Sequence, residues 1–139
     1  MLLARSLVHK PKFLFLDEPT SGLDPATSRM IHDWLLELKE QGTTIFLTTH
    51  DMQEATLLCD RVSLLYQGKL VETDRPANLI RKYYTDKRVQ VCYQDGQEKV
   101  MAYDELVQLE RVEEIETIHS CEPTLEDIFI SLTGGNLNG

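Results

Sequence analysis

Two adjacent carboxylates and a histidine lie where two predicted strands end. Asp17 and Glu18 directly follow the apolar run 13–16. His50 is the residue after the β-branched and apolar run 43–49. A short continuous apolar run is typical of a strand that is buried on both faces in a parallel sheet. In open parallel sheets, ligands bind beyond the carboxyl ends of the strands, so this sheet edge is the first place to expect chemistry.

The connection between the two runs holds one helix, which predicts two parallel strands joined by a right-handed crossover. The carboxyl ends of such strands lie on one edge, about 4.8 Å apart if the strands are neighbours. Asp17, Glu18 and His50 can therefore converge on one small ligand. One carboxylate could hold Mg²⁺, a second could orient or deprotonate a water, and a histidine could hydrogen-bond a phosphate oxygen. This division of roles suits phosphoryl transfer to water.

The helices around this edge have clear start and stop signals. Asp24 is expected to cap the helix between the two strands, with a proline at its first position and Gly42 after its end. A second, short helix follows His50. Asp51 can cap that helix, with Glu54 at its third position in a capping-box arrangement.

The rest of the first region has weaker signals. Residues 1–9 have the apolar spacing of the end of a helix. Residues 62–66 and 69–72 flank a Gln-Gly pair and predict a β-hairpin, and residues 76–84 predict a further helix. The polar stretch 85–88 is interpreted as a boundary, which gives two regions, 1–84 and 85–139.

The second region is predicted to be a small α+β appendage. Residues 89–93 alternate like a half-buried strand, and residues 98–102 could return as its partner after an Asp-Gly turn. Residues 103–109 are expected to be helical, and residues 112–118 alternate apolar with acidic side chains. A last helix should begin near Thr124 and stop at a Gly-Gly pair.

Composition excludes several classes of protein. Hydrophobic residues make up 42% of the 139 residues, which is typical of a globular chain, and the formal net charge is −9. This negative charge argues against a nucleic-acid partner. The apolar runs are far shorter than the roughly 20 residues that a bilayer requires. The three cysteines form no C-x-x-C pair and indicate a reduced, cytosolic protein.

Two segments carry a resemblance to a known family. Residues 16–25 read Leu-Asp-Glu-Pro-Thr-Ser-Gly-Leu-Asp-Pro, and residues 48–51 read Thr-Thr-His-Asp. Both segments resemble the ATPase subunit of ABC transporters: its Walker B strand, its D-loop and its switch histidine. The tail, with Thr-Leu-Glu-Asp-Ile-Phe at 124–129, is similar to the accessory region of subunits that serve drug and antibiotic exporters. The resemblance implies the C-terminal half of an α/β P-loop NTPase domain over 1–84, followed by the accessory region.

The resemblance also implies roles for single residues. Asp17 would hold Mg²⁺ through water, Glu18 would be the catalytic carboxylate that polarises the attacking water, and His50 would contact the γ-phosphate of ATP. The D-loop would meet a second copy of the ATPase subunit across an ATP-sandwich dimer; its residues are Ser21, Gly22, Leu23 and Asp24. For Asp24 the capping role explains the residue by itself, and both roles can hold together. Further partners would be the membrane permease, which would place the chain at the cytoplasmic face of the membrane, and the missing N-terminal half.

One part of the family pattern is absent from these residues. A phosphate-binding loop needs G-x-x-x-x-G-K-[ST], but Gly68-Lys69 is followed by Leu70, and Ser63 stands where the first glycine should be. The signature and glutamine-loop motifs of the family would lie upstream of residue 1. We therefore expect a fragment that hydrolyses almost no ATP alone. We also expect an exposed sheet flank that associates with a complementary half or with itself, or that lowers solubility.

Two alternatives to a transporter ATPase remain open. The chain could be a non-catalytic remnant or regulatory module that binds partners through its acidic tail. It could also belong to an ABC-type ATPase that acts on nucleic acid or ribosomes, although the net charge and the exporter-like tail argue against this. A reading frame upstream that encodes a phosphate loop would favour the transporter ATPase over the remnant.

Overall fold

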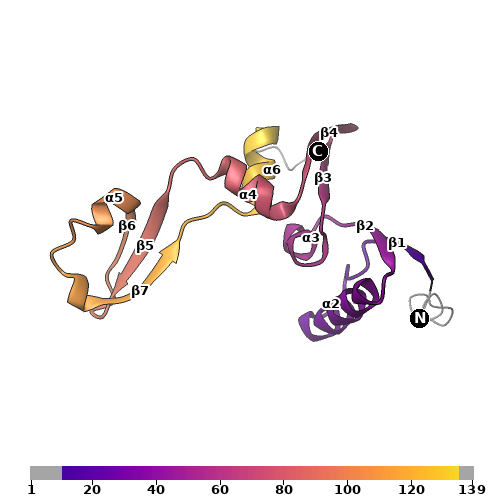
Figure 1. The fold of residues 1–139 in the computed structure, drawn as a ribbon, viewed down its shortest axis with the longest axis horizontal. Helices are drawn as coiled ribbons and strands as arrows, with labels where there is room; N and C mark the ends of the chain where they lie inside the picture. The colour runs from indigo at the N-terminus through magenta and orange to yellow at the C-terminus, as the bar shows by residue number, and fades with distance from the viewer. Residues whose placement is uncertain (1–10, 135–139) are drawn as a thin grey trace. The chain divides into compact units, whose positions relative to one another are not determined.

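The computed structural model describes residues 11–134, so the helix expected over residues 1–9 lies outside the described residues. The chain divides into two compact units, Met1–Asp60 and Arg61–Gly139, each with its own secondary structure (Figure 1). Among residues 11–134, no helix combines the length and the apolar character needed to cross a membrane.

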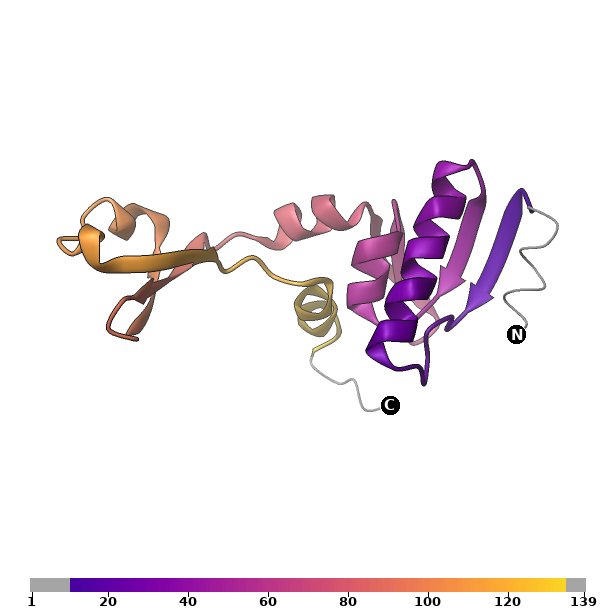
Figure 2. The same ribbon diagram turned by 90° about the horizontal axis from the view of Figure 1, so that it is seen from below.

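The first unit is a two-stranded parallel sheet with two helices. Strand β1 (Phe13–Asp17) leads into α2 (Pro25–Glu40), which returns the chain to β2 (Thr44–Thr48), and α3 (Met52–Leu58) follows. The strands pair in parallel, as the single intervening helix predicts. Helix α2 runs alongside the strands (Figure 2). The carboxyl ends of β1 and β2 therefore lie at one edge.

The core of the first unit lies between the sheet and its helices. Leu14 of β1, Leu35 of α2 and Leu58 of α3 are buried together, with further aliphatic side chains around them. The opposite face is different: Phe15 is 75% exposed and Phe46, its partner across the strands, is 62% exposed. The prediction that the apolar run of β1 is buried on both faces is therefore wrong for the described residues. The predicted exposed flank of the sheet is confirmed for this face.

Both helix caps of the first unit form at the predicted residues. The carboxylate of Asp24 accepts the backbone N–H groups of Ala26 and Thr27 at 3.0 Å each. Asp51 accepts the N–H groups of Gln53 at 2.8 Å and Glu54 at 3.1 Å. Each cap satisfies N–H groups that the first helical turn leaves unpaired. The caps fix where the two helices start relative to the strand ends.

The second unit begins with the predicted hairpin. Strands β3 (Val62–Tyr66) and β4 (Lys69–Asp74) pair antiparallel around Gln67 and Gly68. Both turn residues have positive φ, 48° and 75°, as a tight hairpin turn of the primed type requires. Helix α4 (Pro76–Tyr83) follows.

The remainder of the second unit holds a three-stranded antiparallel sheet and a last helix. The sheet has the order β6-β5-β7, from β5 (Arg88–Tyr93), β6 (Glu98–Ala102) and β7 (Ile115–Ser120). The short helix α5 (Tyr103–Leu106) covers only part of the stretch 103–109 predicted as helical. A 3₁₀ turn, η1 (Val112–Glu114), precedes β7.

The last helix, α6 (Leu125–Thr133), starts at the predicted cap and returns to earlier elements. It packs against α4, as Figure 1 also shows. The rings of Phe129 on α6 and Tyr66 on β3 meet edge to face, with centroids 6.1 Å apart. The predicted boundary after residue 84 falls inside the second unit, between α4 and β5, and it stays a prediction.

Candidate functional site

The edge where β1 and β2 end carries the residues predicted to do chemistry. Asp17 and Thr48 are register partners, and the hydroxyl of Thr48 donates a hydrogen bond to Oδ1 of Asp17. The backbone N–H of Glu18 donates to the carbonyl oxygen of Thr48 at 2.8 Å, which extends the ladder by one step. The two strand ends are thereby locked together at the predicted ligand edge.

Glu18 and His50 form a second side-chain pair at this edge. Nδ1 of His50 lies 2.6 Å from Oε2 of Glu18, which is hydrogen-bond distance. The backbone of Glu18 has φ 48°, in the left-handed region that residues other than glycine rarely occupy. This conformation bends the chain sharply at the end of β1, and the N–H of Ser21 closes the turn on the carbonyl of Glu18 at 3.1 Å. The structure thus brings together two of the predicted catalytic side chains.

Asp17 is the third predicted side chain, and its surroundings can be tested against Mg²⁺. Among residues 11–134, no three His, Cys, Asp or Glu side chains gather closely enough to hold a metal ion by themselves. Mg²⁺ keeps several waters and commonly uses one or two carboxylates together with substrate phosphates. Thr48 engages one carboxylate oxygen of Asp17. This donor set fits an ion held mainly by water and phosphate oxygens, with Asp17 in support.

The predicted D-loop follows as an exposed turn. Ser21, Gly22, Leu23 and Asp24 are all exposed. Gly22 has φ 74°, a conformation that glycine adopts without the steric cost of a Cβ atom. Hydrogen bonds from the hydroxyl and then the backbone N–H of Thr27 hold the pKa of Asp24 below its ordinary value. The structure therefore shows the capping role of Asp24, while the dimer role of these residues stays a prediction.

A buried carboxylate beneath this edge was missed by sequence reasoning. Glu54 was expected to turn back toward the cap of α3. Instead, its Oε1 accepts the hydroxyl of Thr20 at 2.7 Å and lies 3.0 Å from Nε2 of His32. The capping-box prediction for Glu54 is therefore wrong, because the side chain points inward. A signal was present, since Glu54 shares the helical spacing of the buried residues Ala55 and Leu58.

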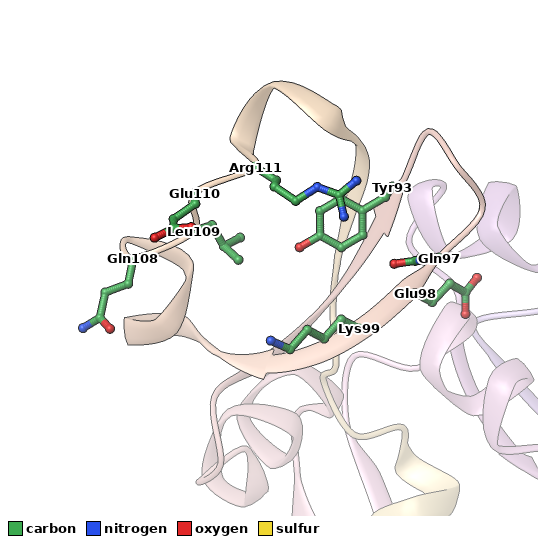
Figure 3. Close-up of a pocket in the computed structure, with 8 residues that line it drawn as sticks. All are labelled: Tyr93, Gln97, Glu98, Lys99, Gln108, Leu109, Glu110 and Arg111. Atoms are coloured by element: carbon green, nitrogen blue, oxygen red, sulfur yellow. The ribbon is translucent and has the colours of Figure 1, made fainter.

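The second unit carries an open pocket of about 440 Å³, shown in Figure 3. The guanidinium of Arg111 lies over the ring of Tyr93, 5.5 Å from its centroid, which is cation–π distance. Arg111 also pairs with Glu114 and Asp95, so its charge is already compensated. None of the predicted site residues lines this pocket; its lining is Tyr93, Gln97, Glu98, Lys99, Gln108, Leu109, Glu110 and Arg111.

The chain is similar to a described protein family and to several known proteins. A family model described as "AAA domain, putative AbiEii toxin, Type IV TA system" matches residues 1–55, which include Asp17, Glu18 and His50. A "Fluoroquinolones export ATP-binding protein" of Mycobacterium tuberculosis is 43% identical over 96% of this chain and 48% of its own length. The "Probable multidrug ABC transporter ATP-binding protein YbhF" of Escherichia coli is 44% identical over 63% of this chain and 15% of its own length.

One solved structure shares the fold of this chain. This structure, described as "Structure of ATP binding subunit of ABC transporter", superposes with a TM-score of 0.55 at 20% identity, over 89% of this chain and 37% of that chain. This likeness confirms the predicted fold class, part of an α/β P-loop NTPase domain with a small α+β region. The chain spans about half the length of the mycobacterial relative. With 43% identity to the mycobacterial protein over 96% of its residues, the chain is a homologue of ATP-binding proteins of ABC transporters.

Proposed function

We propose that this chain supplies the metal-binding and water-activating side of an ATP hydrolysis site that powers an ABC transporter. The observation that carries the proposal is the contact of 2.6 Å between Glu18 and His50, at the edge where two parallel strands end. A carboxylate and an imidazole at the carboxyl ends of parallel strands stand where such sheets bind their ligands.

Each side chain has a distinct role in the proposal. Glu18 accepts a hydrogen bond from the attacking water and takes its proton as the water oxygen bonds to the γ-phosphorus. The bond from that phosphorus to the β,γ-bridging oxygen breaks in the same step, and ADP is the leaving group. His50 in its imidazolium form has two N–H groups. Nδ1–H donates to Glu18, which leaves Nε2–H free to donate to a γ-phosphate oxygen and to stabilise the charge that develops there.

Asp17 would hold the hydration shell of Mg²⁺. When bound, the ion neutralises charge on the β- and γ-phosphate oxygens of ATP. The hydrogen bond from Thr48 fixes one oxygen of the Asp17 carboxylate, so that the orientation of the carboxylate is set before the ion arrives. Ser21, Gly22, Leu23 and Asp24 would contact a second copy of the ATPase subunit, and their exposure supports that proposal.

Hydrolysis would require groups that these 139 residues do not carry. The sequence has no G-x-x-x-x-G-K-[ST] loop, whose backbone N–H groups and lysine hold the phosphates. Each charge-assisted hydrogen bond of such a loop contributes about 1.5–3 kcal/mol, so the chain alone should bind ATP weakly and hydrolyse almost none. The exposed face around Phe15 and Phe46 supports a complementary half as partner.

The names of the relatives support an export function. They describe a fluoroquinolones export protein and a multidrug ABC transporter protein, so we propose export of small organic molecules through separate permease subunits. Binding to the permease would hold the chain at the cytoplasmic face of the membrane.

The proposal can be tested in an assembled domain, which we define as this chain fused behind an ABC ATPase half that carries the phosphate loop and signature motif. Phosphate release with Mg²⁺ and ATP would be measured for the unaltered fusion and for Asp17→Asn and His50→Ala. We expect both substitutions to lower kcat by about 100-fold or more, as loss of a catalytic group does. Asp33→Asn, on the exposed side of α2, is the matched control. Unchanged kcat in both variants would refute the assigned roles.

A further inference from the structure

Glu54 is a buried carboxylate that the proposed hydrolysis does not use. It lies on α3 and is 2% exposed. Its Oε1 accepts the Thr20 hydroxyl at 2.7 Å and lies 3.0 Å from Nε2 of His32. Its Oε2 is buried and has no hydrogen-bond partner among the described residues. Burying a carboxylate with one oxygen unpaired costs free energy, so the inward position needs a physical reason.

The contacts of Glu54 join the same two segments as the Glu18–His50 pair. Thr20 lies two residues after Glu18, in the turn that follows β1. Glu54 lies four residues after His50, in the first turn of α3, the helix that follows β2. The Thr20–Glu54 hydrogen bond therefore connects the turn beyond one strand end to the helix beyond the other.

Helix α2 adds a third anchor to this cluster. His32 comes from the middle of α2 and meets the same carboxylate oxygen as Thr20. Oε1 of Glu54, a residue of α3, thus contacts both the turn after β1 and helix α2. Glu18 itself sits in an unfavourable left-handed conformation, which persists only where the surroundings enforce it. The hydrogen bond from Thr20, two residues after Glu18, to the buried carboxylate of Glu54 can hold the backbone of Glu18 in this conformation.

We propose that Glu54 is a positioning residue, which holds the turn at Thr20 against the start of α3 and so keeps Glu18 and His50 within hydrogen-bond distance. Glu54 acts through Thr20 and touches neither of the two side chains that it positions. The inference rests on the proposed function of Glu18 and His50. The inference adds Glu54, which lies away from the ligand edge, to the residues that this site needs.

The first test is nuclear magnetic resonance of the whole chain with ¹⁵N-labelled histidine. The ring nitrogen shifts report which nitrogen of His50 carries a proton, and a hydrogen-bond partner sets that choice. In the unaltered chain we expect Nδ1 to be protonated by virtue of its bond to Glu18. Thr20→Val keeps the side-chain volume but removes the donor to Glu54, so the signal of Nδ1-protonated His50 should be lost. Thr20→Ser, which keeps a hydroxyl, should restore it.

Two further variants separate positioning from general stability. Thr56→Val is the matched control, because the hydroxyl of Thr56 donates only within α3, to the carbonyl of Met52 at 2.7 Å. It should leave the His50 signal unchanged. Glu54→Gln keeps one acceptor oxygen, so it should shift the signal in the same direction as Thr20→Val but less. If Thr20→Val does not fold, Glu54→Gln decides the question. A folded variant of either kind with an unaltered His50 signal would overturn the inference.

In the assembled domain, Thr20→Val should lower kcat by about 10- to 100-fold, because small misplacements of a catalytic group have effects of that size. The KM for ATP should stay near its original value, since Thr20 contacts no nucleotide in this proposal. A change in KM alone would overturn the positioning role. The two proposals fail separately: an unchanged kcat in His50→Ala refutes the proposed function, whereas an unchanged His50 signal in Thr20→Val refutes only this inference.

Discussion

Nδ1 of His50 lies 2.6 Å from Oε2 of Glu18, although the two residues are 32 positions apart in the chain. The parallel register of β1 and β2 brings their segments together, because Asp17 pairs with Thr48 at the strand ends. The left-handed backbone at Glu18 then turns the chain away from the sheet. The contact is therefore a product of topology and of one local conformation.

The cap of α2 should contribute to stability through the Asp24 carboxylate. We predict that Asp24→Ala lowers the thermal unfolding midpoint, because the N–H groups of Ala26 and Thr27 lose their acceptor. Asp24→Asn should lower the unfolding midpoint by less, since asparagine also caps helices well. Circular dichroism melts of both variants would measure this, with Asp33→Ala as the control. Equal melting of Asp24→Ala and the unaltered chain would contradict the capping role.

The capping box of α6 should make part of the stability depend on pH. Hydrogen bonds from the backbone N–H and the hydroxyl of Thr124 hold the pKa of Asp127 below its ordinary value. A carboxyl group with a lowered folded pKa stabilises the fold above its unfolded pKa, about 3.9, and loses this contribution as the pH falls through the folded pKa. We predict that Asp127→Asn costs about 1 kcal/mol near neutral pH, in the range of other lost caps.

The test of this pH dependence is urea unfolding of both proteins between pH 7 and pH 2.5. The difference in unfolding free energy should be full above pH 4 and should shrink below it. A difference that stays constant over the whole range would show that the charge of Asp127 is not involved.

The cysteines should differ in reactivity. Burial raises the pKa of the Cys59 thiol, and the charge of Lys39 opposes this rise only in part. Cys121 is exposed. Because the thiolate is the nucleophile, we predict that iodoacetamide at pH 8 labels Cys121 before Cys59. Mass spectrometry of timed samples would follow both sites, and Cys121→Ser would remove the fast phase. Labelling of Cys59 first would contradict the burial of this thiol.

The exposed aromatic face of the first unit should promote association. Phe15 and Phe46 lie on adjacent strands with ring centroids 5.9 Å apart, and both are exposed. Exposed apolar surface of this kind drives association in water. We predict that the double substitution Phe15→Ser and Phe46→Ser lowers the apparent mass in sedimentation velocity at a fixed protein concentration. Phe13→Ser tests the edge of the same face. A monomeric unaltered chain would contradict this prediction.

The sequence predicted the ligand edge because strand runs, caps and turn residues are local signals. The runs at 13–16 and 43–49 and the cap at Asp24 fix the strands, the intervening helix and their direction. The inward turn of Glu54 could not be predicted, because its partners are 34 and 22 positions away in the chain. Its position after Asp51 favoured a local capping bond, and the tertiary contacts outweighed that preference.

Burial was harder to predict than secondary structure. An apolar run such as 13–16 indicates a strand, but the run alone does not say which of its faces is covered. In the structure Leu14 packs in the core and Phe15 does not. The return of α6 to α4 was also beyond sequence reasoning, since it depends on how the chain between them folds. The dimer role of residues 21–24 stays a prediction, because it concerns contacts with a second molecule.

The most direct measurement is phosphate release from ATP by the chain alone and by the assembled domain, each with and without Glu18→Gln. We predict that the chain alone shows no hydrolysis above the Glu18→Gln background. The assembled domain should hydrolyse ATP and lose about 100-fold or more of its kcat on Glu18→Gln, as removal of a general base does. Robust hydrolysis by the chain alone that Glu18→Gln abolishes, or an assembled domain that Glu18→Gln leaves unaffected, would contradict the proposed function.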